Sequence, residues 1–132
     1  MSVLVADDDP FGRMFIESLM QKKNWSPVCA KDGQEAIDLC RDSRFDMILM
    51  DVQMPRVDGC SAATAIRRME KDMNRLRTPI VALTACALKG DFERCMNAGM
   101  DRYLAKPIRM DALYGEIESL LCPGVNSGGI KK

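Results

Sequence analysis

Short apolar runs alternate along this chain with longer stretches in which apolar residues recur every three or four positions. The runs lie at residues 3–6, 27–30, 47–50, 80–83 and 103–105. Continuous runs of this length are typical of buried strands in a parallel sheet, because both faces of such a sheet are covered. The stretches between them have helical periodicity and lie at residues 10–19, 35–40, 62–69, 88–98 and 111–121. The pattern predicts an α/β fold of five strand–helix units, with a doubly wound parallel sheet between two layers of helices.

Capping residues support two of these boundaries. Asp9 precedes a proline at the first helical position, which favours an N-cap at Asp9 over a third metal ligand. Gly99 follows the fourth helical stretch and is a C-cap signal. In the first helix, we expect Phe11, Met14 and Phe15 to face the core, although this helix begins beside the predicted pocket and part of it could meet a phosphodonor.

The length and charge of the chain limit the classes of function. Its 132 residues suit a single domain at residues 1–122, and the Gly-, Pro- and Ser-rich residues 123–132 are predicted to form a flexible tail or truncated linker. Lys plus Arg equals Asp plus Glu at 19 each, so nothing indicates nucleic-acid binding. Apolar runs are too short to cross a membrane and no signal peptide is evident. We therefore expect a cytoplasmic monomer without membrane contact.

Cysteine and histidine usage narrows the chemistry further. The six cysteines contain no C-x-x-C pair and most fall in apolar or helical patterns, which favours buried free thiols over disulfides or a metal site. Histidine is absent. This absence excludes histidine-ligated zinc, a histidine-assisted Ser or Cys nucleophile, and phosphohistidine formed on these 132 residues.

Polar residues follow the predicted strands at their carboxyl ends. Asp7 and Asp8 follow the first strand, Asp51 the third, Thr84 the fourth and Lys106 the fifth. Ligands of open α/β sheets bind beyond these strand ends, where the strand order reverses. If the order is 2-1-3-4-5, the first and third strands are neighbours, and all five side chains share one pocket.

The residue types in this predicted pocket suit a hard divalent cation. Three converging carboxylates offer the oxygen ligands that Mg²⁺ prefers. Three aspartates, Lys106 and one divalent ion sum to zero charge, so the ion and the ammonium group together relieve the repulsion between the acids. A carboxylate that faces both is placed to attack a phosphoryl group.

Four stretches carry a resemblance to a known family: VLVADDDP, DMILMDVQMPRVDG, TPIVALTA and DRYLAKPI. Together they resemble the receiver domains of two-component response regulators, from residue 3 to about residue 121. MDVQMP and ALTACALKGDFERCMNAGMD are most similar to receiver domains fused to hybrid histidine kinases. The resemblance implies a flavodoxin-like (βα)5 fold with sheet order 2-1-3-4-5.

The resemblance also implies a set of roles at the acidic pocket. Asp51 matches the phosphoacceptor and Mg²⁺ is the implied cofactor. Asp8 matches a direct metal ligand and Asp7 one that usually acts through water. Asp51 and the backbone carbonyl of Gln53 complete the implied protein ligands.

Further positions match the switch and the residues that tune the phosphoryl lifetime. Thr84 resembles the hydroxyl residue that turns toward the phosphoryl oxygens, and Lys106 their counter-ion, with a cis bond to the proline that follows. Tyr103 matches the switch aromatic. Gln53 and Cys86 match the variable positions that control access of attacking water.

The implied function is that of a phosphoacceptor in a His-to-Asp phosphorelay. Such a domain catalyses only its own Mg²⁺-dependent phosphorylation and dephosphorylation, and phosphorylation switches a protein-interaction face. The donor is expected to be a histidine kinase or a histidine phosphotransfer domain. Whether the chain stands alone or is part of a hybrid kinase stays open.

Two other functions are consistent with part of the pattern. Asp7-Asp8-Asp9 contains the D-x-D of haloacid-dehalogenase-like phosphatases, which are Mg²⁺-dependent and would use Asp7 as the nucleophile. Phe11, however, stands where those enzymes prefer Thr or Val, and Asp51 would have no role. The third hypothesis is an interaction module with a vestigial pocket.

Overall fold

The structure is a computed structural model that describes residues 1–85 and 89–121. Its elements in chain order are β1 (Ser2–Ala6), α1 (Pro10–Lys22), β2 (Ser26–Ala30), α2 (Gly33–Asp42), β3 (Met47–Asp51), α3 (Gly59–Asp72), β4 (Ile80–Thr84), α4 (Lys89–Asn97), β5 (Arg102–Ala105) and α5 (Met110–Leu121). All ten predicted elements are present. The second and third helices extend beyond their predicted ends, by two and three residues at each end. Cys86 and the predicted tail at residues 123–132 lie outside the described residues.

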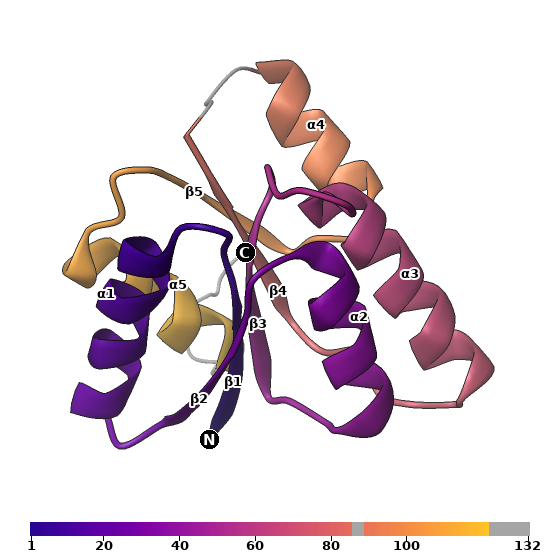
Figure 1. The fold of residues 1–132 in the computed structure, drawn as a ribbon, viewed down its shortest axis with the longest axis horizontal. Coiled ribbons are helices and arrows are strands. Elements are labelled where there is room, and N and C mark those ends of the chain that lie inside the picture. Colours follow the sequence, from indigo (N-terminus) through magenta and orange to yellow (C-terminus); the bar gives the residue numbers. More distant parts are fainter. Residues whose placement is uncertain (86–88, 122–132) are drawn as a thin grey trace.

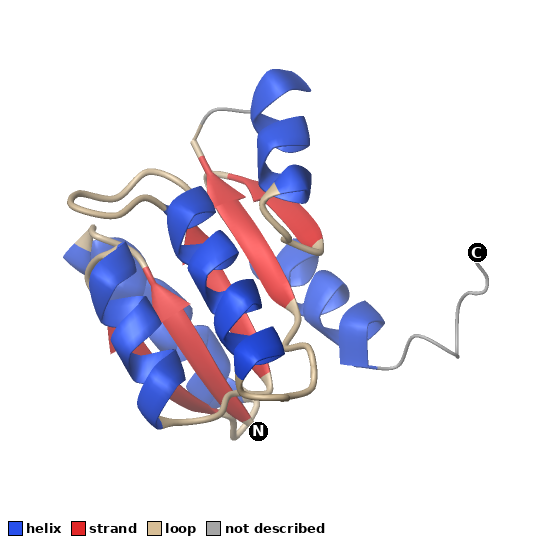
Figure 2. Cartoon of the chain, turned by 90° about the vertical axis from the view of Figure 1, so that its right-hand side faces the viewer, coloured by secondary structure: helices blue, strands red, loops and turns tan. Residues whose placement is uncertain are grey.

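The five strands form one parallel sheet in the order β2-β1-β3-β4-β5, as predicted. The chain therefore reverses its direction of winding between β1 and β3, which lie side by side with Ala6 opposite Met50. Figure 1 shows the helices on both sides of the sheet, and Figure 2 shows the same layers from the side. This arrangement brings the residues after β1 and β3 to one edge of the sheet.

Alternating side chains of the strands fill two cores, one on each face of the sheet. Leu4, Ile48 and Ile80 face the side covered by α2, α3 and α4. Val3 and Leu49 face the side covered by α1 and α5. Both faces are apolar because helices cover both, which explains the continuous apolar runs in the sequence. None of the helices in the described part of the chain is long and apolar enough to cross a membrane.

The apolar stripe on α1 is wider than the surface that packs on the sheet. Ile16 and its neighbours Leu19 and Met20 are buried. Phe11, Met14 and Phe15 were expected to face the core, but their exposed fractions are 78%, 62% and 44%, and the expectation is wrong. These three lie along the adjacent stripe of the helix, turned toward solvent. Periodicity identified the helix but not which part of a broad apolar surface is covered.

Among the described residues, the helix caps and the burial of the cysteine thiols are as the sequence analysis predicted. Asp9 caps α1, and its side chain accepts a hydrogen bond from a backbone N–H in the first turn. Gly99 has a φ of 100° at the end of α4, a left-handed conformation that glycine adopts without strain. Cys40, Cys60 and Cys95 are buried free thiols and Cys29 is half-buried and free.

At the end of the sheet where the strands begin, several segments are joined by one arginine that the sequence analysis did not identify. Arg67 on α3 has a side chain only 14% exposed. Its guanidinium donates to the backbone oxygens of Gly99 and Thr78, both at 2.8 Å. It also pairs with Glu70 at 2.8 Å and Asp101 at 2.9 Å. Arg67 therefore joins α3 to the segments that enter β4 and β5.

We expect Arg67→Ala to lower the free energy of unfolding by about 2–4 kcal/mol, because it leaves two carboxylates and two carbonyls without their buried donor. Urea denaturation measures the effect. Arg68→Ala is the matched control, since Arg68 is the exposed neighbour on the same helix, and it should change stability by less than about 0.5 kcal/mol. Equal effects for the two variants would contradict the structural role of the network.

Candidate functional site

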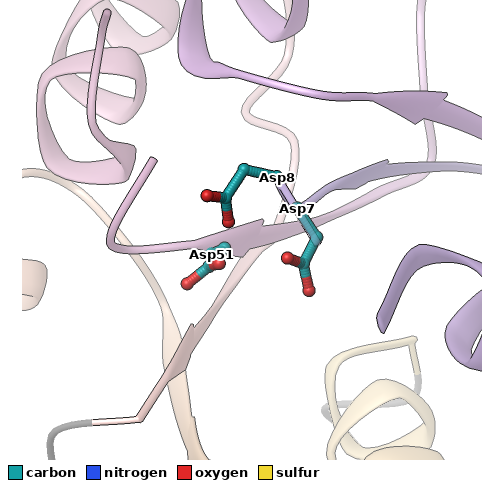
Figure 3. Close-up of side chains that lie close together, drawn as sticks. All are labelled: Asp7, Asp8 and Asp51. Atoms are coloured by element: carbon teal, nitrogen blue, oxygen red, sulfur yellow. The ribbon is translucent and has the colours of Figure 1, made fainter. Parts of the chain in front are cut away.

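Three carboxylates gather where β1 and β3 end. Asp7 and Asp8 follow β1, and Asp51 is the last residue of β3 (Figure 3). One carboxylate oxygen of each lies within 4.8 Å of the others. Asp7 and Asp51 are buried, with exposed fractions of 0% and 4%, whereas Asp8 is exposed. The neighbouring strands thus bring residues 43 positions apart into one acidic site.

The backbone fixes two of these carboxylates. Asp7 Oδ1 accepts a hydrogen bond from the Asp9 N–H at 2.9 Å, and Asp51 Oδ1 accepts one from the Gln53 N–H at 3.3 Å. The first residue of α3, Gly59, lies directly against the end of β3. A Cβ on Gly59 would lie 2.2 Å from the Asp51 backbone oxygen, so only glycine allows this approach.

One cation, Lys106 after β5, lies against the two buried acids. Its Nζ is 3.1 Å from Asp51 Oδ2 and 3.3 Å from Asp7 Oδ2. The Lys106 N–H also donates to the backbone oxygen of Thr84 at 2.7 Å, which anchors the lysine beside the end of β4. The bond from Lys106 to Pro107 is cis, as expected. The three acids and this lysine carry a formal net charge of minus two.

Burial and charge alter the proton affinities at this site. Burial raises the pKa of Asp51 from 3.8 to about 6, against the lowering effect of Lys106, and the neighbouring Asp7 raises it further. Burial alone would lower the pKa of Lys106, but Asp51 and Asp7 outweigh it and raise that pKa. Lys106 thus stays charged, while Asp51 holds its proton to a higher pH than an exposed carboxyl group does, and a further positive charge would favour its anion.

A match to a known family accompanies this geometry. Residues 3–118 match the family model described as the response regulator receiver domain, which is most of the chain. The chain belongs to this receiver-domain family. It is therefore a receiver domain of two-component phosphorelay systems, as the sequence motifs indicated.

A relative and two solved structures are similar along most of this receiver domain. A hybrid signal transduction histidine kinase I from Dictyostelium discoideum is 39% identical over 125 residues, covering 91% of this chain but only 7% of the kinase. The chain thus spans a small part of that relative.

A Saccharomyces cerevisiae co-crystal structure of the histidine phosphotransfer protein Ypd1 and the receiver domain of Ssk1 has a TM-score of 0.89 and 29% identity, covering 98% of this chain and 94% of that one. The receiver domain of sensor histidine kinase PA1611 from Pseudomonas aeruginosa has a TM-score of 0.78 and 36% identity, covering 96% and 98%, and contains a magnesium ion in its active-site cleft.

Two further residues of the receiver domain lie on one face of the sheet. Thr84 ends β4 and is buried, with an exposed fraction of 1%. Tyr103 on β5 pairs with Ala82 and packs against the core on the α3 and α4 side. Because side chains alternate along a strand, Thr84 faces the same side as Ala82. The structure thus brings Thr84 and Tyr103 to one face, as their expected roles require.

Two hollows flank the acidic site. A cleft of about 510 Å³ is lined by Asp8, Val52, Gln53, Met54, Pro55, Asp58 and Arg94. A second hollow of about 320 Å³ is lined by Asp7, Asp9, Gly12, Phe15, Ile16, Lys106, Pro107 and Ile108. Arg94 was not identified from the sequence, because nothing in helical periodicity places an α4 residue near the end of β3.

Cys86, expected to tune the phosphoryl lifetime, lies outside the described residues.

The donor set fits a magnesium ion. The site offers carboxylate oxygens, which hard cations prefer, and no nitrogen or sulfur ligand belongs to the three-residue cluster. An open cleft beside Asp8 leaves space for the waters that Mg²⁺ retains. A divalent cation would also bring the formal charge of the four side chains from minus two to zero.

We expect Asp51→Asn to stabilise the fold by about 1–3 kcal/mol at pH 8 without divalent cations, because the raised pKa of Asp51 makes its anion unfavourable in the folded state. A group whose pKa is higher in the folded state than in the unfolded state contributes its full stabilisation of the fold at pH values below the unfolded-state pKa. This stabilisation is lost as the pH rises through the folded-state pKa. The advantage of asparagine should therefore grow between about pH 4 and pH 6 and then level off.

Urea denaturation in EDTA at pH 5 and pH 8 measures this dependence. Added Mg²⁺ should stabilise the parent more than the asparagine variant. An advantage of asparagine that is the same at both pH values would contradict the electrostatic origin.

Proposed function

We propose that Asp51 is the phosphoacceptor of a His-to-Asp phosphorelay and that its phosphorylation switches a protein-interaction face. The observation that supports this most strongly is the geometry of Asp51, which lies buried between two other carboxylates and 3.1 Å from Lys106. A buried anion in such a place is costly unless cations surround it. Family membership supports the same role.

A magnesium ion fits the acidic cluster. Asp8 and Asp51 would bind it directly, Asp7 would act through water, and the backbone carbonyl of Gln53 would complete the protein ligands. When bound, the ion neutralises the carboxylates and the charge that develops on the transferred phosphoryl group. The magnesium ion in the similar PA1611 receiver domain supports this assignment.

The proposed transfer forms one bond and breaks one. A carboxylate oxygen of Asp51 attacks the phosphorus of a phosphohistidine on the donor, and the bond from phosphorus to the imidazole nitrogen breaks with its electron pair on that nitrogen. Lys106 stays within reach of Asp51 and pairs with the phosphoryl oxygens. Asp7 holds this lysine from its other side at 3.3 Å, which keeps the ammonium group aimed at the reacting centre.

The proposed switch begins at Thr84. Phosphorylation replaces the single negative charge of Asp51 with a group that bears roughly two negative charges and several strong acceptors. A hydrogen bond from the Thr84 hydroxyl to such a charged group contributes about 1.5–3 kcal/mol, which shifts a two-state equilibrium by roughly ten- to a hundredfold. Movement of Thr84 leaves space for Tyr103 to turn inward, because both side chains lie on one face of neighbouring strands. This remodels the surface of α4, β5 and α5.

The lifetime of the phosphoryl group is proposed to depend on two variable positions. Gln53 lines the cleft beside Asp8 and lies next to Asp51, to which its N–H donates. Its side chain can therefore control the access of water to the acyl phosphate. Cys86 is proposed to act likewise. We further propose that residues 1–122 form the receiver unit, followed by a tail or linker.

The partner is proposed to be a histidine kinase or a histidine phosphotransfer domain that docks on α1. The exposed side chains of Phe11, Met14 and Phe15 form an apolar surface on this helix, here called the α1 patch. Phe15 also lines the hollow that contains Asp7 and Lys106, so the patch is continuous with the acidic site. The similar Ssk1 receiver domain, crystallised with a histidine phosphotransfer protein, supports this class of partner.

Incubation with acetyl phosphate and Mg²⁺ should label Asp51, and Asp51→Asn should abolish labelling, because Asp51 matches the family's phosphoacceptor and its carboxylate lies 3.1 Å from Lys106. Peptide mapping by mass spectrometry identifies the modified residue. A label on Asp7 would support the haloacid-dehalogenase-like alternative instead. No label, together with no binding of Mg²⁺ or beryllofluoride, would support the inert interaction module.

We expect Phe11→Ala to slow phosphoryl transfer from a phosphorylated histidine phosphotransfer protein about five- to thirtyfold, because a large apolar side chain at an interface contributes about 1–2 kcal/mol. Labelling by acetyl phosphate should be unchanged, since this small donor does not need the α1 patch. Leu76→Ala is the matched control, because Leu76 is 80% exposed in the loop before β4. Slower transfer in the control, or unchanged transfer in Phe11→Ala, would place the donor elsewhere.

A further inference from the structure

Among the described side chains of helix α4, Cys95 is buried in the core and Met96 packs partly buried against it. Among residues 90–97, Cys95 is the fully buried one, and it interacts with Cys60 at the start of α3. The neighbouring α3, by contrast, buries six residues. Figure 1 shows α4 projecting beyond the ends of the neighbouring helices. An element with so little buried surface is easily displaced, so each of its remaining contacts has a large influence on its position.

One of these contacts joins α4 to the proposed switch residue. The rings of Phe92 on α4 and Tyr103 on β5 meet edge to face, with centroids 5.4 Å apart and planes at 74°. This is a favourable geometry for two aromatic rings. Phe92 remains 46% exposed, so its ring does not belong to the core although it contacts Tyr103.

The pair of Phe92 and Tyr103 lies close enough to Thr84 for a movement of Tyr103 to affect it. Phe92 and Thr84 both lie on the α3 and α4 side of the sheet, with Tyr103 on the strand next to Thr84. If a turn of Tyr103 toward Thr84 carries its ring away from Phe92, the contact with Phe92 exists in one position of Tyr103 and not in the other. Such a differential contact is what a two-state switch needs.

We infer that Phe92 is a positioning residue that holds Tyr103 against α4 in the unphosphorylated domain and releases α4 when Tyr103 turns inward. This inference rests on the proposed switch function of Thr84 and Tyr103. An edge-to-face pair shifts such an equilibrium by about threefold to tenfold. Phe92 thereby links the state of Asp51 to the exposed surface of α4.

The test uses 3-fluorotyrosine incorporated into the full chain and observed by fluorine NMR. The chain has two tyrosines, and the second provides an internal reference. Tyr114 lies on the other face of the sheet, where its hydroxyl donates to the Leu19 backbone oxygen at 2.6 Å. Spectra are recorded with EDTA and then with Mg²⁺ and beryllofluoride, and Tyr114→Phe assigns the two resonances.

Phe92→Leu should move the Tyr103 equilibrium toward its beryllofluoride-bound position by about threefold to tenfold without any phosphoryl mimic. Phe92→Trp retains an aromatic ring without adding a tyrosine and should behave like the parent. Glu93→Ala changes the adjacent exposed residue of α4 and should leave the Tyr103 resonance at its parental position. The Tyr114 resonance should be the same in all variants, which shows that the fold is intact.

Three different results would overturn the inference, and they are distinguishable. A parental Tyr103 resonance that does not respond to Mg²⁺ and beryllofluoride would refute the proposed tyrosine switch, and the role of Phe92 with it. The parental Tyr103 resonance could respond to Mg²⁺ and beryllofluoride while Phe92→Leu gives the same spectra as the parent in both conditions. That result would refute only the role of Phe92. An effect of Glu93→Ala as large as that of Phe92→Leu would also refute it, because the cause would then be general loosening of α4.

Discussion

The repulsion between buried carboxylates at the ends of β1 and β3 is the constraint on which the site depends. Two unit charges about 5 Å apart repel by roughly 3 kcal/mol at an effective dielectric of about 20. Lys106 relieves part of this repulsion through its contacts with Asp7 and Asp51. Burial, with a smaller contribution from Asp7, raises the pKa of Asp51, and the remaining negative charge favours a cation at this site. Under the proposed function, phosphoryl charge added at Asp51 would change the contacts that Lys106 and Thr84 prefer.

The two apolar cores make the sheet a rigid support for this charge. Helices on both faces bury β1, β3 and β4 almost completely, and the Arg67 network holds the opposite edge of the sheet. The acids therefore cannot easily separate to relieve their repulsion, and the proposed response to phosphorylation would occur in less firmly held parts of the domain. Helix α4, which rests on Cys95 and on the pair of Phe92 and Tyr103, is such a part.

The errors and omissions of the sequence interpretation share one physical cause. Phe11 and Phe15 belong to an apolar stripe with the right period, but periodicity does not show how much of a stripe the sheet covers. Arg67 has the appearance of an ordinary helical surface residue, and two of its partners, Gly99 and Asp101, lie more than 30 positions away. The aromatic pair likewise joins two elements whose relative position is set by packing.

The sequence by itself determined the ten elements, the parallel sheet and the chemistry available at the strand ends. Local patterns suffice for these, because burial on both faces of a parallel sheet leaves continuous apolar runs and because capping residues act on their own helix. The family motifs also assigned the strand order. Tertiary structure alone decided that one lysine contacts two of the three acids, that the α1 patch is exposed, and that Phe92 rests on Tyr103. Each of these depends on distances between elements far apart in the chain, which are fixed only when the helices pack on the sheet.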